Sequence, residues 1–175
     1  GNNNAYCQDN AIGWIDWAFL SDHGDEGHDL HLFVKRLIAL RRQHPVLRRS
    51  RFLHGHAVSR RGLKDITWIT PQGTEKVEDE WKDPHARSIG LLLSGEARGF
   101  LAADGSPLDD GVLCILMNAY TGPVGFTLPI LPGGRVWSRL LDTADPKADT
   151  GDRRVHMGAD YSLSDRSLVI FLLET

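Results

Sequence analysis

The side chains best suited to bind a ligand lie at the start of the chain. Amide, carboxylate and phenol groups follow one another there, at Asn2, Asn3, Asn4, Tyr6, Gln8, Asp9 and Asn10. Amides donate and accept hydrogen bonds, and a tyrosine ring can stack on the apolar face of a sugar, so the set suits a neutral, polyhydroxylated ligand. Consecutive asparagines also build turns, because their side chains cap local backbone and tolerate left-handed conformations. Both interpretations stay open, and Tyr6 and Asp9 are the best binding candidates.

Three further groups of titratable residues invite a metal-binding or acid–base interpretation. They are His23, Glu26, His28 and His31, then His54 and His56, and then Asp83 and His85. The histidines follow no closed zinc spacing and have no neighbouring cysteine, so a solvated loop and helix start explains them; we predict no metal and no cofactor. Asp83 and His85 flank a proline without an evident nucleophile, and we expect a structural loop there.

Tryptophan is the other residue type with a possible binding role. The chain has five, Trp14, Trp17, Trp68, Trp81 and Trp137. Exposed tryptophans form sugar-stacking platforms in carbohydrate-binding modules. In a small β domain they more often fill the core or an interface with a neighbour, and we expect that role here.

Composition and charge exclude several function classes. Of 175 residues, 41% are hydrophobic and 25% are charged, which is typical of a folded soluble domain and argues against disorder. The formal net charge of -3 gives no electrostatic basis for binding nucleic acid or an anionic membrane, so a neutral substrate fits better. No apolar run reaches the roughly 20 residues that span a bilayer. Cys7 and Cys114 lie too far apart to indicate a disulfide framework, and we expect a cytoplasmic protein.

One amphipathic helix is predicted over residues 29–44. Apolar side chains recur there at spacings of three and four, at Leu30, Phe33, Val34, Leu37 and Ile38. Asp29 at its start and Arg41 and Arg42 near its end complement the helix dipole, and Pro45 terminates it. Such a helix must bury its stripe against another element. The chain begins with glycine rather than methionine, and we expect the partner to lie upstream in a longer protein.

After Pro45 the pattern changes to short apolar runs separated by turn residues. Strands are predicted at residues 66–70, 88–93, 111–118, 125–128, 136–142 and 167–173, with glycine and proline between them. The polar stretch 72–87 contains Trp81 and is interpreted as an ordered excursion. Antiparallel strands joined in this way usually form a sandwich, so the sequence predicts a mainly β fold: an antiparallel β-sandwich preceded by one amphipathic helix.

Several long strings resemble the bacterial glycogen debranching enzymes, the isoamylase-like branch of the α-amylase clan of glycoside hydrolases. They are GNNNAYCQDN at 1–10, IGWIDW at 12–17, DITWITPQGTEKVEDEWKDPHARSIGLLLSGEA at 65–97, LMNAY at 116–120 and RLLDTADP at 139–146. These strings occur in the same order as in that family and cover nearly the whole chain. The chain therefore resembles the carboxy-terminal portion of such an enzyme.

The resemblance implies a (β/α)8 barrel flanked by β domains in the complete enzyme, hydrolysing α-1,6 branch linkages of glycogen-type glucans. Residues 1–48 would be the last loop and helix of that barrel, and 49–175 the carboxy-terminal β-sandwich. The implied substrate-binding residues are Asn4, Tyr6, Gln8 and Asp9, in a loop on the substrate face of the barrel. Such enzymes use two carboxyl groups about 5 to 5.5 Å apart, one nucleophile and one acid.

The family motifs that carry those carboxylates do not occur in this sequence. We therefore expect no catalytic residue in the chain and no activity from it alone, with the β domain bracing the missing barrel. Its partners would be that barrel and, through the intact enzyme, glycogen or maltooligosaccharide, with no nucleic acid and no membrane. Two rival hypotheses are a stand-alone carbohydrate-binding module for α-glucans and a structural or assembly element that associates through the orphaned helix.

Overall fold

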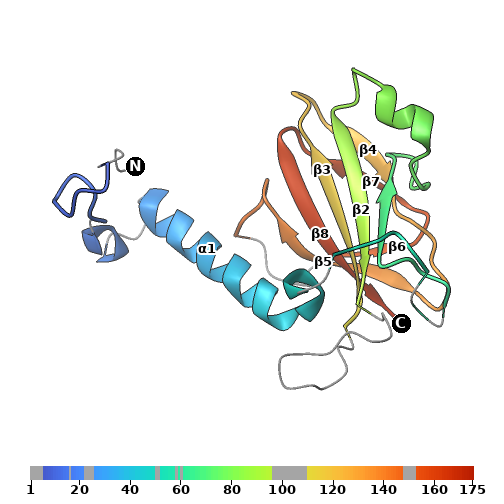
Figure 1. The fold of residues 1–175 in the computed structure, drawn as a ribbon, viewed down its shortest axis with the longest axis horizontal. Helices are drawn as coiled ribbons and strands as arrows, with labels where there is room; N and C mark the ends of the chain where they lie inside the picture. The colour runs from blue at the N-terminus through green and yellow to red at the C-terminus, as the bar shows by residue number, and fades with distance from the viewer. Residues whose placement is uncertain are drawn as a thin grey trace. The chain divides into compact units, whose positions relative to one another are not determined.

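The computed structural model describes residues 6–15, 17–21, 26–49, 52–57, 59, 61–95, 110–147 and 153–175. The chain divides into two compact units, Gly1–Leu40 and Arg41–Thr175 (Figure 1). The first unit contains a loop, the 3-10 helix η1 (Trp17–Ser21) and most of helix α1 (Glu26–Gln43). No helix among the described residues is long and apolar enough to cross a membrane.

Helix α1 forms where the apolar periodicity predicts it, and it begins three residues earlier. Glu26 and Asp29 lie in its first turn and Arg41 and Arg42 in its last, where they complement the helix dipole. Pro45 then opens the short 3-10 helix η2 (Pro45–Arg48). The stripe residues Leu30, Val34 and Ile38 are 61%, 43% and 49% exposed, so this chain leaves much of the apolar face of α1 in contact with solvent.

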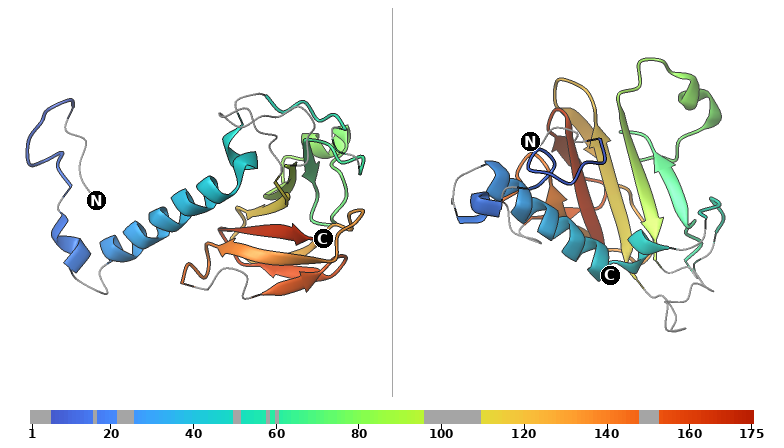
Figure 2. Two further views of the ribbon diagram at one scale, coloured as in Figure 1. Left: turned by 90° about the horizontal axis from the view of Figure 1, so that it is seen from below. Right: turned by 60° about the vertical axis from the view of Figure 1, so that its left-hand side comes forward.

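The second unit is built on a six-stranded antiparallel sheet. Its strands are β1 (Ile66–Ile69), β2 (Ser88–Ser94), β3 (Val112–Asn118), β5 (Val136–Asp142), β6 (Arg154–His156) and β8 (Ser167–Glu174). Their order in the sheet is β1-β2-β3-β8-β5-β6, and every neighbouring pair is antiparallel. The right-hand view of Figure 2 shows β8, in red, between yellow β3 and orange β5.

A two-stranded antiparallel sheet of β4 (Val124–Thr127) and β7 (Asp160–Leu163) forms the second layer. Phe126, Tyr161 and Leu163 from this layer join Trp137 and Phe171 of the large sheet in one buried cluster. Tyr161 and Phe171 meet edge to face with ring centroids 5.0 Å apart. The core therefore lies between two antiparallel sheets, which confirms the predicted mainly β, sandwich-like fold with one α-helix.

The large sheet is apolar on its other face as well. Cross-strand pairing aligns Leu91 with Ile115 and Ile115 with Ile170, and aligns Met117 with Leu168. Leu91, Ile115, Met117 and Leu168 are only half-buried. Antiparallel sheets that face water on one side normally carry polar residues there. This second face is better suited to packing than to solvent.

The six predicted strands all form, with ends that agree within about two residues. Two strands were not predicted, β6 and β7, which are three and four residues long and have no proline beside them. The equally short β1 and β4 were predicted because Pro71 and Pro123 mark where the chain turns. The predicted excursion after β1 contains the 3-10 helix η3 (Glu78–Lys82).

Candidate functional site

The loop predicted to bind substrate is described from Tyr6 onward; Asn4 lies outside the described residues. Tyr6 and Cys7 both have positive φ, 47° and 62°, in the left-handed region that costs a non-glycine residue free energy. The side chain of Tyr6 is largely exposed. The loop thus places an aromatic ring at the surface through two consecutive left-handed residues.

The polar side chains of this loop mostly bond to one another. The Asp9 carboxylate accepts a hydrogen bond from the Trp14 indole at 2.5 Å, and the Gln8 carbonyl oxygen accepts one from the Asn10 amide at 2.9 Å. Asn10 also receives the backbone amide of Ile12 at 3.1 Å. Asn10 therefore builds a turn, as asparagines do, and the role of Tyr6, Gln8 and Asp9 in binding a ligand stays a prediction.

The described histidines and the Asp83–His85 segment lie in local, structural arrangements. His23 lies outside the described residues, and the described part of the chain contains no group of three His, Cys, Asp or Glu side chains that could hold a metal ion. His54 and His56 stack with ring centroids 6.4 Å apart. The Asp83 carboxylate accepts the backbone amide of His85 at 2.9 Å, a local turn of the kind expected for a structural loop.

Only one of the five tryptophans lies in the core. Trp137 is fully buried and its indole donates a hydrogen bond to the carbonyl of Pro129 at 3.0 Å. Trp14, Trp17, Trp68 and Trp81 are exposed. The expected core role is therefore confirmed for Trp137, and the expected interface role of the other four stays a prediction.

Trp68 and Trp81 form the wall of a hollow in the β domain. Their rings meet edge to face, with centroids 5.8 Å apart and planes 83° apart, and they are 37% and 50% exposed. The Lys76 ammonium lies 5.1 Å from the centroid of the Trp81 ring. The hollow encloses about 370 Å³, and Leu53, His54, Gly55, Ile66, Glu75 and Lys76 complete its lining.

A tight turn brings the two tryptophans together. After β1 the chain reverses at Pro71–Gly73, and the Lys76 amide donates to the Trp68 carbonyl at 2.8 Å, so residues 74–76 run back along β1. Gly73 has φ +76°, and a Cβ there would lie 2.4 Å from the carbonyl oxygen of Thr127. The reversal therefore requires glycine, and η3 then carries Trp81 against Trp68.

Three residues that line this hollow, His54, Gly55 and Ile66, are held by a buried carboxylate. Asp65 is 1% exposed and accepts hydrogen bonds from the backbone amides of His54, Gly55 and Ile66 at 2.8 to 2.9 Å. Burial alone would raise the pKa of Asp65, but these amides and the charge of Arg49 lower it below its ordinary value. Arg49 in turn donates to the carbonyl of Ser94. Asp65 is therefore an ionised structural group.

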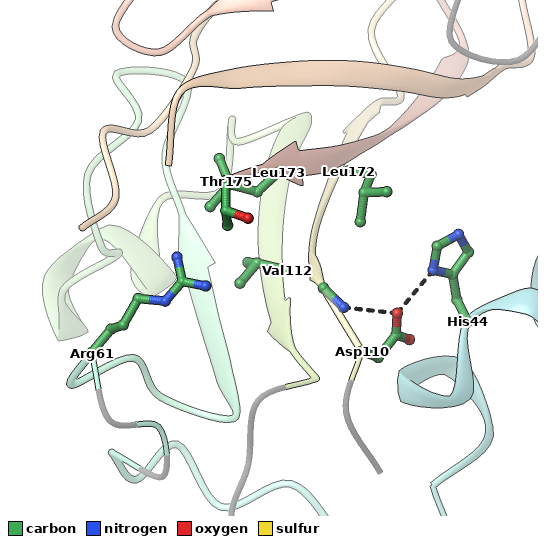
Figure 3. A pocket seen from close by; sticks show the side chains of 8 residues that line it. His44, Arg61, Asp110, Val112, Leu172, Leu173 and Thr175 are labelled. Atoms are coloured by element: carbon green, nitrogen blue, oxygen red, sulfur yellow. Dashed lines mark hydrogen bonds and ion pairs between the residues drawn. The ribbon is translucent and has the colours of Figure 1, made fainter. Parts of the chain in front are cut away.

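A second hollow, of about 430 Å³, lies where η2 meets the start of β3 (Figure 3). Asp110 accepts hydrogen bonds from His44 Nδ1 at 3.1 Å, from the Val46 amide at 3.0 Å and from the Gly111 amide at 2.8 Å. A carboxylate only accepts, so Nδ1 of His44 carries the proton. Among the described residues His44 contacts no serine, threonine or cysteine hydroxyl or thiol, so this pair ties η2 to the sheet and forms no triad.

Comparison with known proteins decides the family. Residues 65–172 match the family described as "Isoamylase, C-terminal". The chain belongs to the isoamylase C-terminal family. The matched region begins just before β1 and ends within β8, and it contains Trp68 and Trp81, whereas Leu53, His54 and Gly55 of the hollow lie before it.

The relatives of this isoamylase C-terminal chain are much longer proteins. The "Glycogen operon protein GlgX homolog" of Mycobacterium tuberculosis (strain ATCC 25618 / H37Rv) is 34% identical over 97% of the chain and 23% of its own length. The "Isoamylase" of Pseudomonas amyloderamosa is 29% identical over 82% of the chain and 16% of its length. The "Glycogen debranching enzyme" of Erwinia tasmaniensis is 40% identical over 47% and 11%. The chain thus spans less than a quarter of the relatives it matches.

Sequence reasoning missed the hollow between Trp68 and Trp81. The two residues are separated by a turn, a return strand segment and η3, so no periodicity links them. The only signal was compositional: a tryptophan within a polar stretch beside Pro71 and Gly73.

Proposed function

We propose that this chain is the carboxy-terminal part of a glycogen debranching glycoside hydrolase that cleaves α-1,6 branch linkages. The support is the set of relatives named as isoamylase and glycogen debranching enzyme, which the chain matches over up to 97% of its length. In this proposal the polypeptide that makes up the rest of the relatives supplies the catalytic barrel. The intact enzyme acts on glycogen or maltooligosaccharide, and its location is the cytoplasm.

The chain itself supplies no catalytic carboxylate in this proposal. Retaining hydrolysis needs two carboxyl groups about 5 to 5.5 Å apart, one ionised and free to attack and one protonated. Asp65 and Asp110 each accept three hydrogen bonds from the protein. Asp142 accepts from Tyr161, Arg139 and the Ala144 amide. Groups engaged in this way serve the fold rather than the reaction.

The β domain braces the barrel in this proposal. The observation that carries it is the exposed aliphatic face of α1, formed by Leu30, Val34 and Ile38 at spacings of four. Burying the parts of these side chains that this chain exposes would contribute roughly 1 kcal/mol each. The natural occupant is the rest of the barrel, with residues 1–48 as its last loop and helix and 49–175 as the bracing domain. The Asp110 hydrogen bonds to His44 and Val46 would transmit that support from the sheet to the segment that follows α1.

Substrate contact by the opening loop belongs to the same proposal. Asn4, Tyr6, Gln8 and Asp9 would contact the glucan at the active-site end of the barrel. The exposed ring of Tyr6 is the group best placed to stack on a sugar, whereas Asp9 and Gln8 already bond within the loop.

The test measures reducing ends released from a branched α-glucan. The 175-residue chain and the intact enzyme are compared at equal concentration. The intact enzyme should release linear chains, and the chain alone should match a protein-free control. Deleting the β domain from the intact enzyme should lower both its melting temperature and its turnover. Turnover by the purified chain would refute the proposal that the chain lacks the catalytic carboxylates. A β-domain deletion without effect would refute the bracing role.

A stand-alone carbohydrate-binding module is the second candidate function. The specific observation in its favour is the exposure of Trp68 and Trp81. It differs from the first candidate in requiring no partner barrel, so an intact enzyme that debranches glycogen excludes it, whatever the hollow binds.

A further inference from the structure

Within the proposed function, the hollow between Trp68 and Trp81 has no assigned role. Two half-exposed indoles line it together with three polar or ionised side chains, Glu75, Lys76 and His54. Leu53, Gly55 and Ile66 complete the lining. Its volume of about 370 Å³ falls within the range of roughly 300–1,000 Å³ typical of small-ligand sites.

The mixture of groups identifies the chemistry of a ligand. An aromatic face attracts the weakly positive C–H groups on one face of a pyranose, while carboxylate and ammonium groups bond its equatorial hydroxyls. Glu75 already accepts from Lys64 and Lys76 already donates to the Glu80 carbonyl, each at 2.6 Å, but a carboxylate has further acceptor sites and an ammonium has three donors. Because hydroxyls both donate and accept, a neutral sugar can bond to both residues without a net charge of its own. A charged ligand of either sign would meet a like charge at one of these two residues.

The surroundings disfavour burial of the hollow against another protein domain. Glu75 accepts from Lys64 at 2.6 Å, and Lys82 pairs with Asp79 at 2.9 Å on η3, with the Asp79 side chain 91% exposed. The centres of protein interfaces are depleted in such charges, and desolvating an ion pair costs more than its attraction returns unless the geometry is ideal. The charge-free stripe of α1 is the surface suited to a protein partner.

We propose that the hollow lined by Trp68, Trp81, Glu75 and Lys76 binds a linear α-1,4-linked glucan segment. The choice of an α-glucan rests on the proposed function, because the relatives are named for isoamylase, glycogen and debranching. One or two glucose units stack on the indoles, and the rest of the glucan extends across the exposed side of η3.

The probe is maltoheptaose, titrated into the full 175-residue chain with tryptophan fluorescence and calorimetry as readouts. Trp81→Ala should weaken binding by about tenfold or more, the effect of removing an aromatic hot spot, and Trp81→Phe should retain part of the affinity. The matched control is Trp17→Ala, which removes another exposed tryptophan, in η1, and should leave binding unchanged. Thermal unfolding of each variant separates lost binding from lost folding.

Cellohexaose tests the linkage. Its β-linked chain offers similar C–H faces in an extended rather than curved arrangement, so it should bind at least several times more weakly than maltoheptaose. Absence of maltoheptaose binding, equal binding of cellohexaose, or affinity that survives in folded Trp81→Ala protein would overturn the proposed site. Debranching by the intact enzyme is measured separately, so a hollow that binds nothing refutes this site while the proposed enzymatic function stands.

Discussion

Helix α1 and the tryptophan hollow both expose apolar side chains, and they differ in what surrounds them. On α1 the exposed residues Leu30, Val34 and Ile38 are aliphatic and follow one line along the helix. In the hollow the exposed residues Trp68 and Trp81 are aromatic and lie among charged groups.

The difference teaches how to assign a partner to an exposed apolar surface. Aliphatic side chains make no directional contacts and gain only from excluding water, so they favour another packed protein surface. Indole rings beside ionised groups offer stacking and hydrogen bonds at once, which suits a ligand that is itself half apolar and half polar. Four substitutions or conditions can break or sharpen this contrast.

Asp65→Ala should have the largest effect and should act on the hollow alone. It leaves the amides of His54, Gly55 and Ile66 without their buried acceptor, so the free energy of unfolding should fall by about 3 kcal/mol or more, measured by urea denaturation. Asp79→Ala, at a side chain 91% exposed, is the control and should change it by less than about 0.5 kcal/mol. Equal effects from the two substitutions would show that Asp65 does not hold the wall of the hollow.

Gly73→Ala should destabilise the turn after β1, which positions the return segment beside Trp68. The new Cβ meets the Thr127 carbonyl at 2.4 Å and the residue must keep a φ of +76°, so we expect a loss of about 1–3 kcal/mol. It should also weaken any ligand binding at the hollow, because the turn sets the return segment that pairs with Trp68. Gly125→Ala is the matched control: its Cβ would meet nothing within 4 Å. A neutral Gly73→Ala would show that the turn can relax.

The sequence predicts most of the secondary structure but not the tryptophan hollow. The helix and six strands follow from local patterns: the spacing of Leu30, Val34 and Ile38, and apolar runs bounded by glycine and proline. Strand β7 was missed because only Tyr161 and Leu163 of its four residues are apolar and no proline marks its ends; β4 is as short, but Pro123 marks its start. The sequence does not predict the hollow, because its lining comes from segments around Leu53, Trp68 and Trp81 that only the tertiary fold brings together.

The opening loop shows the same limit at smaller scale. Its composition predicts either turns or ligand contacts, and the structure gives Asn10 and Asp9 internal hydrogen bonds while leaving Tyr6 exposed. Residue types alone could not divide the set in this way, because amides and carboxylates serve both purposes equally well.

Val34→Asp sharpens the contrast from the helix side. The side chain is exposed, so the stability of the isolated chain should change by only about 0.5 kcal/mol, yet a charge in the stripe should abolish concentration-dependent self-association of the chain. Sedimentation velocity at several concentrations is the measurement. Ala39→Asp introduces the same charge nearly half a turn away around the helix and should leave association intact. Trp81→Ala should also leave it intact. A wild-type chain that is monomeric at every concentration would refute self-association through the stripe, whereas packing of the stripe on the barrel is tested in the intact enzyme.

The pH dependence of stability should show a smaller effect than Asp65→Ala. The folded-state pKa of Asp65 lies below its unfolded value, so the unfolded chain binds the proton first as pH falls. The stabilisation by the carboxylate is therefore complete above the unfolded pKa, and it is lost as pH falls through the folded-state pKa. Asp65→Asn should therefore flatten the fall in unfolding free energy below about pH 4, by at most about 1.4 kcal/mol per pH unit. Glu78→Gln, at a side chain 92% exposed, is the control and should leave the slope unchanged. Because Asn keeps the shape and one acceptor of Asp, an unchanged slope in Asp65→Asn would mean that the three amides hold this wall of the hollow through geometry alone, without the carboxylate's charge.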